Sequence, residues 1–153
     1  MAESQFVYVT YIRTTAEKLW RALTEPEFTR QFWMGTTQES KWKPGASWRI
    51  VKPNGATADS GEVIAIEPHK RLVLRWQNHM FPEMTAEGYS RLTYTLEEKG
   101  DSVKLTILHE MDKPDSKFIK AVSGGWPMIL ASLKSLLETG ESLEATRNWP
   151  EGM

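Results

Sequence analysis

A chain of 153 residues predicts one domain, spanning residues 1–153 with its core in residues 6–140. Its 19 Lys and Arg nearly balance 20 Asp and Glu at a formal net charge of −1, and without concentrated positive charge we expect no binding to nucleic acid or to an anionic membrane. The absence of Cys excludes disulfides, thiolate nucleophiles and Cys-ligated metals.

The first third of the chain predicts one strand and two short helices. Residues 6–13 are almost all β-branched or aromatic, which is typical of a strand. Residues 14–17 match a capping box and predict a short helix that ends at 24–26. A second short helix or turn is expected to carry the aromatic residues of 28–33 towards the sheet, before a polar loop over 35–45.

A meander of strands is predicted next. The strands are expected at about 46–52, 61–67, 71–78, 88–98 and 102–110. Turn residues such as those at 53–55 and 99–101 separate them, which favours antiparallel neighbours. Apolar and polar residues alternate along the strands, so one face of the sheet is predicted to be apolar and the other solvated.

The C-terminal part predicts one long amphipathic helix. Its apolar residues recur at i, i+3, i+4, i+7, i+10 and i+11 from Trp126 and line one helix face. Pro127 is expected in the first turn and Gly140 just past the end, while residues 112–123 are compatible with a short lead-in helix. Because the apolar sheet face needs a cover, we predict an α+β fold in which this helix packs across an antiparallel sheet.

Several segments resemble a known family. They are residues 16–27, 43–49, 61–76 and 103–110, and Gly125-Trp126-Pro127 with the helix after it. In these segments the chain resembles the helix-grip fold of the START-like (SRPBCC, Bet v allergen-like) superfamily. Within that superfamily it resembles the family named after the C-terminal domain of the activator of heat-shock-protein-90 ATPase. The resemblance implies a curved sheet that grips the last helix around an apolar cavity, which superfamily members use to hold lipids, sterols or polyketides.

Strand parity and helix periodicity predict which side chains face the interior between sheet and helix. The candidates for lining a ligand cavity there are Trp48, Ile50, Leu74, Trp76, Tyr94, Ile107, Ile129 and Leu133. Met80, Phe81 and Met84 lie between two predicted strands, where polar residues are usual, and are candidates for its entrance. Core packing would explain the same residues without a ligand, so both interpretations stay open.

Two side chains are candidates for proton transfer. His109 ends the last predicted strand and faces inward by parity, and Glu62 is a carboxylate on an earlier strand. A structural His that forms hydrogen bonds near the strand end is the favoured interpretation of His109. No His residues lie at ligand spacing and no nucleophile elbow is present, so neither a metal nor another cofactor is expected.

Three functions follow as alternatives. The favoured hypothesis is a noncatalytic module that binds a small hydrophobic molecule, lipid or aromatic, between the sheet and the last helix. An enzyme of the aromatase/cyclase or hydrolase kind could use the same cavity with His109 or Glu62. A chaperone-interacting module, which the family name implies, would need a complementary outer surface. The N-terminus lacks signal-peptide features and no apolar run reaches about 18 residues, so we expect a cytoplasmic protein without membrane insertion; no pattern specifies an oligomeric state.

Overall fold

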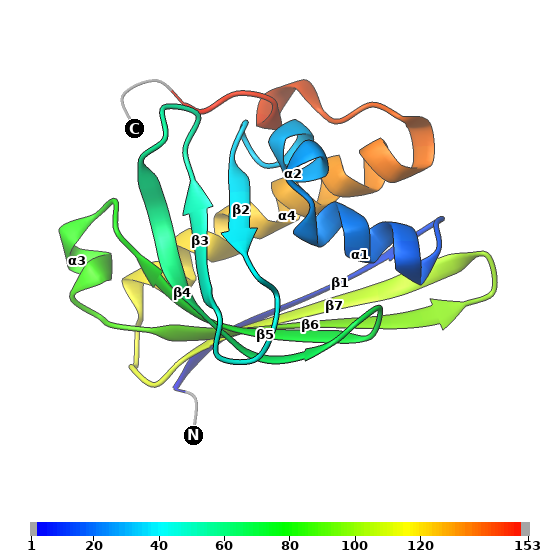
Figure 1. Ribbon diagram of the computed structural model, residues 1–153. Coiled ribbons are helices and arrows are strands. Elements are labelled where there is room, and N and C mark those ends of the chain that lie inside the picture. The colour runs from blue at the N-terminus through cyan, green and yellow to red at the C-terminus, as the bar shows by residue number, and fades with distance from the viewer. Residues whose placement is uncertain (1–2, 151–153) are drawn as a thin grey trace.

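The computed structural model describes residues 3–150, which form a curved antiparallel sheet around one long helix (Figure 1). The elements are β1 (Ser4–Ile12), α1 (Ala16–Thr24), α2 (Pro26–Phe32), β2 (Thr37–Ser40), β3 (Ser47–Val51), β4 (Thr57–Glu67), β5 (Arg71–Asn78), α3 (Pro82–Thr85), β6 (Ser90–Lys99), β7 (Ser102–Met111), α4 (Lys117–Thr139) and the 3₁₀ helix η1 (Glu144–Thr146). Helices α1 and α2 lie beside the C-terminal half of α4, and α3 lies near its N-terminal end (Figure 1). The predicted α+β helix-grip architecture is confirmed.

The seven strands pair in the order β1-β7-β6-β5-β4-β3-β2. Every pair is antiparallel, so β3 to β7 form the predicted meander, β2 extends it, and the first strand pairs with the last. The prediction of a polar loop over 35–45 was wrong because this segment contains β2, and β4 begins at Thr57, earlier than expected. Both errors have the same cause, since these strand segments are rich in polar residues that give no apolar alternation.

The sheet bends where β4 pairs with β3 and β5. Register shifts interrupt the pairing at Ile50/Val51 of β3 and at Val63/Ala65 of β4, and such bulges bend and twist a sheet. Between them Gly61 lies so close to β5 that an added Cβ would sit 1.7 Å from the carbonyl oxygen of Arg75. A side chain at this position would push β4 and β5 apart, so the curvature depends on this glycine.

Helix α1 begins one residue later than the capping box predicted. The N-cap is Thr15, whose hydroxyl accepts a hydrogen bond from the backbone N–H of Lys18 at 3.2 Å. The box that pairs Thr14 with Glu17 was therefore wrong in register, although the helix itself and its end at Thr24 are as predicted. Glu25 separates the two helices, and Pro26 is the first residue of α2.

Helix α4 is longer than predicted. It begins at Lys117 with Ser116 as N-cap, so residues 112–123 are not a separate lead-in helix and Pro127 lies in the helix interior. The predicted start was wrong because Gly124-Gly125 and Pro127 are helix breakers by local preference, and tertiary packing overrides them here. The predicted end is confirmed, since Gly140 caps the helix in the left-handed region at φ 88°.

The core fills the space between the concave sheet face and α4. Ile12, Leu72, Leu105 and Leu133 are among the side chains fully removed from solvent there. Burial of each such side chain contributes about 1.5–3 kcal/mol, which holds α4 against the sheet. Within residues 3–150, no helix is both long and apolar enough to cross a membrane.

Candidate ligand-binding site

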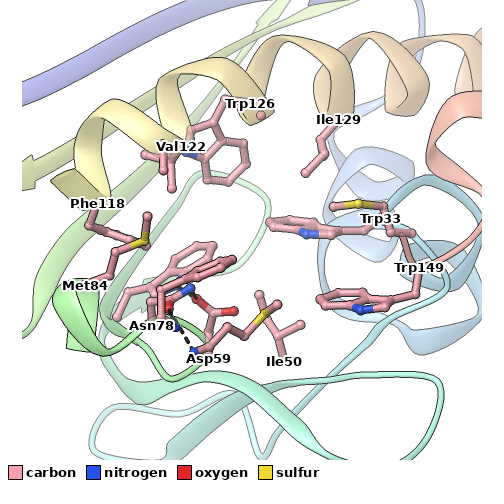
Figure 2. A pocket seen from close by; sticks show the side chains of 16 residues that line it. Trp33, Ile50, Asp59, Asn78, Met84, Phe118, Val122, Trp126, Ile129 and Trp149 are labelled. Carbon is pink, nitrogen blue, oxygen red and sulfur yellow. Dashed lines mark hydrogen bonds between the residues drawn. The ribbon is translucent and has the colours of Figure 1, made fainter. Parts of the chain in front are cut away.

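A cavity of about 210 Å³ remains between the sheet and the N-terminal half of α4. Strands β3, β4 and β5 form one side, α4 the opposite side, and α3 and the segment after η1 lie around the rim (Figure 2). Its lining is mainly apolar, and six of the lining residues are aromatic: Trp33, Trp76, Phe81, Phe118, Trp126 and Trp149. The sheet and helix therefore do not close completely around their aromatic residues.

The indole rings form a continuous cluster around this cavity. The ring centroids of Trp33 and Trp126 lie 5.2 Å apart in an edge-to-face arrangement, and those of Trp76 and Trp126 lie 5.9 Å apart. Trp48 is not part of the lining and packs against Trp76, with the two ring centroids 4.8 Å apart. Such contacts fix ring positions, so the cavity walls are preorganised for an apolar guest.

Asp59 of β4 places a carboxyl group in this apolar surrounding. Its Oδ2 accepts hydrogen bonds from Trp76 Nε1 at 2.7 Å and from Asn78 Nδ2 at 3.3 Å. Burial raises the pKa of Asp59 to about 6, because both donors are neutral and compensate only in part for the lost hydration. Among the described residues that line the cavity, Asp59 alone has an ionisable side chain.

Met80, Phe81 and Met84, the residues predicted at the entrance, all line the cavity. Asn78 holds their segment in place, since its Oδ1 accepts hydrogen bonds from the backbone N–H groups of Met80 at 2.9 Å and Phe81 at 3.1 Å. Phe81 remains 38% exposed, so this wall reaches solvent. The two Met side chains are flexible, which suits a wall that adapts to a guest.

A carboxylate links this wall to α4. Glu87 accepts hydrogen bonds from the hydroxyl of Ser116 at 2.6 Å and from the backbone N–H groups of Lys117 at 2.8 Å and Phe118 at 3.3 Å. Although burial opposes it, these hydrogen bonds hold the pKa of Glu87 below its usual range. The negative charge also lies at the positive end of the α4 dipole. The cavity wall that contains α3 is thus fastened to the start of α4.

The predicted ligand-binding residues divide into two groups. Ile50, Trp76 and Ile129 line the cavity. The others, Trp48, Leu74, Tyr94, Ile107 and Leu133, lie in the packed core at 0–2% exposure and are not part of the lining. Strand parity and helix periodicity placed all of them on inward faces, but these patterns do not separate side chains that meet other side chains from those that meet the cavity.

His109 lies in the core beside the cavity. Its Nδ1 accepts a hydrogen bond from Trp126 Nε1 at 3.1 Å, which leaves the proton on Nε2 to be donated to the hydroxyl of Ser90 at 2.9 Å. Burial lowers the pKa of His109 to about 3, so the ring is neutral. Because it holds the indole of Trp126 in position and is not part of the cavity lining, the geometry fits a structural role.

Glu62 lies apart from the cavity. It is partly exposed and forms an ion pair with Arg75 at 3.1 Å. Neither Glu62 nor His109 is among the cavity-lining residues, and no group of three His, Cys, Asp or Glu suited to a metal ion occurs in residues 3–150.

Three residues that line the cavity were not assigned to it from the sequence. Asp59 precedes the predicted start of its strand, although it shares strand parity with Gly61 and Val63 and would have been placed inward by a longer strand. Trp33 was expected to approach the sheet but was not assigned to a cavity. Trp149 lies beyond the last predicted element, and no local pattern brings it back to the site.

A curved antiparallel sheet wrapped around a long C-terminal helix, with a cavity between them, defines the helix-grip fold of the START-like superfamily. The family model for Activator of Hsp90 ATPase homolog 1-like proteins matches residues 13–138. The chain belongs to this family.

Solved structures agree with this assignment. A protein of Mesorhizobium loti is 28% identical, with a TM-score of 0.75 over 88% of this chain and 97% of that one. The Aha1 dimer of Colwellia psychrerythraea (19% identity, TM-score 0.71, 91% and 99% covered) and an Hsp90 activator of Plasmodium falciparum (20%, 0.70, 87% and 95%) share the fold. The comparison with curated proteins gave no match.

Proposed function

We propose that this protein binds a small, largely apolar molecule in the cavity between β3–β5 and α4. The observation that carries the proposal is a cavity of about 210 Å³ whose walls are mostly apolar, with six aromatic side chains, and whose only ionisable lining side chain within the described chain is Asp59. Cavities of roughly 150 Å³ with apolar walls accept benzene. The guest that fits is therefore about one or two rings in size.

The size of the cavity sets the expected affinity. A one-ring guest of about eight non-hydrogen atoms that gains about 0.6 kcal/mol per atom binds with about −5 kcal/mol, a Kd of roughly 0.2 mM. A guest that also extends past Met80, Phe81 and Met84 to the rim would bury more surface and bind more tightly.

Tryptophan fluorescence tests the proposal. Four of the seven Trp residues, Trp33, Trp76, Trp126 and Trp149, line the cavity, so a guest there changes their emission. Titration with benzyl alcohol, toluene and cyclohexanol is expected to give a saturable change for at least one compound. Emission that stays constant, or changes only linearly with concentration, for the whole set would contradict a binding role.

A second candidate function is proton transfer on a bound guest. It is supported by Asp59, whose pKa is raised to about 6 by burial and whose carboxyl group faces the cavity, since general acids and bases work best with a pKa near the working pH. This alternative retains the predicted enzyme of the aromatase/cyclase or hydrolase kind but replaces His109 and Glu62 by Asp59. Conversion of a bound guest by the wild type and not by Asp59→Asn is the expected result, and equal conversion by both would exclude it.

Contact with a chaperone of the Hsp90 kind is a separate proposal, suggested by the family. Val7, Val9 and Tyr11 form an exposed row on β1 and offer an apolar surface for it. The expected result is a faster chaperone ATPase with the wild type and a smaller effect with Val9→Lys. No change in the ATPase rate with the wild-type protein would exclude this role.

A further inference from the structure

The carboxyl group of Asp59 is unusual for a cavity that holds only apolar guests. It is 8% exposed and receives hydrogen bonds from Trp76 and Asn78, both of them neutral. No Lys or Arg of the described chain forms an ion pair with it. A buried carboxylate without a Lys or Arg partner is costly, and an apolar residue here would bind an apolar guest better.

The rings around Asp59 add a second observation. Trp33, Trp76, Phe118 and Trp126 all face the same cavity, and Trp126 lies across it from Asp59 (Figure 2). The electron-rich faces of indole rings attract cations, and the attraction is stronger where water is excluded. The carboxylate of Asp59 and the faces of the indole rings therefore both attract a positive charge.

Resting on the proposed function, we infer that the guest is an organic cation, a primary or quaternary ammonium on a small apolar body, whose charge lies between Asp59 and the indole rings. The ammonium supplies a direct cationic partner for the carboxylate, and the apolar body fills the space towards Met80 and Met84. No covalent step is involved.

Two basic side chains lie near the cavity. His79 follows β5, and its Nε2 is hydrogen-bonded to the hydroxyl of Ser60 beside Asp59. Lys52 approaches the outer part of the site with Nζ 5.3 Å from the ring centroid of Trp149. Both oppose a bound cation when charged. Below pH about 6 Asp59 takes up a proton and loses its negative charge, so the affinity for a cation falls as the pH falls.

Matched probes test the inference. Benzylammonium and benzyl alcohol have the same size and differ in charge, so their Kd values are measured side by side for the wild type and for Asp59→Asn at pH 7.5 and pH 5. We expect the wild type at pH 7.5 to bind benzylammonium about tenfold more tightly than benzyl alcohol. Asp59→Asn, whose amide oxygen still accepts a hydrogen bond from Trp76 Nε1, is expected to lose this preference for benzylammonium.

The outcomes separate the two proposals. Benzyl alcohol that binds as well as or better than benzylammonium to the wild type at pH 7.5 would overturn the cation inference and leave the binding function intact. Absence of binding by both probes and by the neutral set would remove the binding function itself. Should Asp59→Asn fail to fold, the wild type alone decides, since equal benzylammonium affinity at pH 7.5 and pH 5 contradicts a role for the carboxylate.

Discussion

Gly125 provides a direct way to fill the cavity without altering its walls. It lies in α4 and lines the cavity, and an added Cβ there would meet no atom within 4 Å. Its neighbour Gly124 is equally free of contacts but is exposed and not part of the lining. Gly125→Leu and Gly124→Leu are therefore a matched pair, in which both remove a helix glycine and only the first occupies the cavity.

The two variants should differ in the free energy of unfolding. Replacement of a helix glycine by Leu gains about 0.8 kcal/mol in helix propensity, which is the whole expected effect of Gly124→Leu. Gly125→Leu also buries its side chain among apolar atoms, which adds about 1.5–3 kcal/mol before about 0.5–1 kcal/mol of rotamer entropy is lost. We expect Gly125→Leu to be stabilised by about 2–3 kcal/mol.

Ligand binding should change in the opposite sense. The Leu side chain occupies the space of a one-ring guest, so the Kd for benzyl alcohol should rise at least about tenfold in Gly125→Leu and stay unchanged in Gly124→Leu. Chemical denaturation and fluorescence titration measure the two quantities on the same samples. Wild-type affinity in a folded Gly125→Leu would refute the position of the site. A loss of stability of more than about 1 kcal/mol would refute the claim that the space is empty.

Three further predictions concern stability. Asp59→Asn should be more stable than the wild type at pH 7.5 by up to about 3 kcal/mol, because the wild type loses stability as the pH rises from about 4 to about 6, the folded pKa of Asp59. Denaturation across this range checks that the difference disappears near pH 4. The wild type should lose stability as the pH falls below 6.5, because the unfolded chain binds a proton at His109 that the buried ring, with a folded pKa of about 3, does not bind. In His109→Gln the free energy of unfolding should depend less on pH in this range. A pH dependence equal to that of the wild type would contradict the neutral ring. Glu87→Gln should lower the free energy of unfolding by about 1–2 kcal/mol at pH 7, and this difference should vanish as the pH falls through the lowered pKa of Glu87. The control Glu83→Gln, on exposed α3, should have almost no effect. Thermal unfolding of both variants measures the difference.

The strands and the fold could be predicted because local pattern and tertiary role agree there. Apolar residues alternate in β5, β6 and β7, and the concave face buries the side chains that parity assigns to it. The helix start could not be predicted, since Gly124 and Pro127 favour a break and only packing of residues such as Phe118 and Ile119 on the core keeps the helix continuous. The resemblance to the family then predicted that the curved sheet wraps around the last helix.

The site was predicted only in part. The segment around Met80 stood out because apolar residues are rare between strands, and it does line the cavity. Asp59 carried no such signal, since a polar residue near a predicted turn is usual. It points inward because β4 begins already at Thr57, so that Asp59 shares the strand parity of Gly61 and Val63. Which inward residues line a cavity depends on how completely side chains from distant segments fill the space, as Trp149 illustrates, and this is a property of three-dimensional packing.

The methionine methyl groups offer the most direct test that the cavity admits a guest. Met34, Met80 and Met84 line it, whereas Met111 is buried elsewhere and Met128 is exposed on α4. In NMR spectra of methyl-labelled protein titrated with benzyl alcohol and benzylammonium, we predict saturable shifts of the first three signals and constant positions for the other two. Signals of Met34, Met80 and Met84 that do not move, or that move no more than those of Met111 and Met128, would contradict the account.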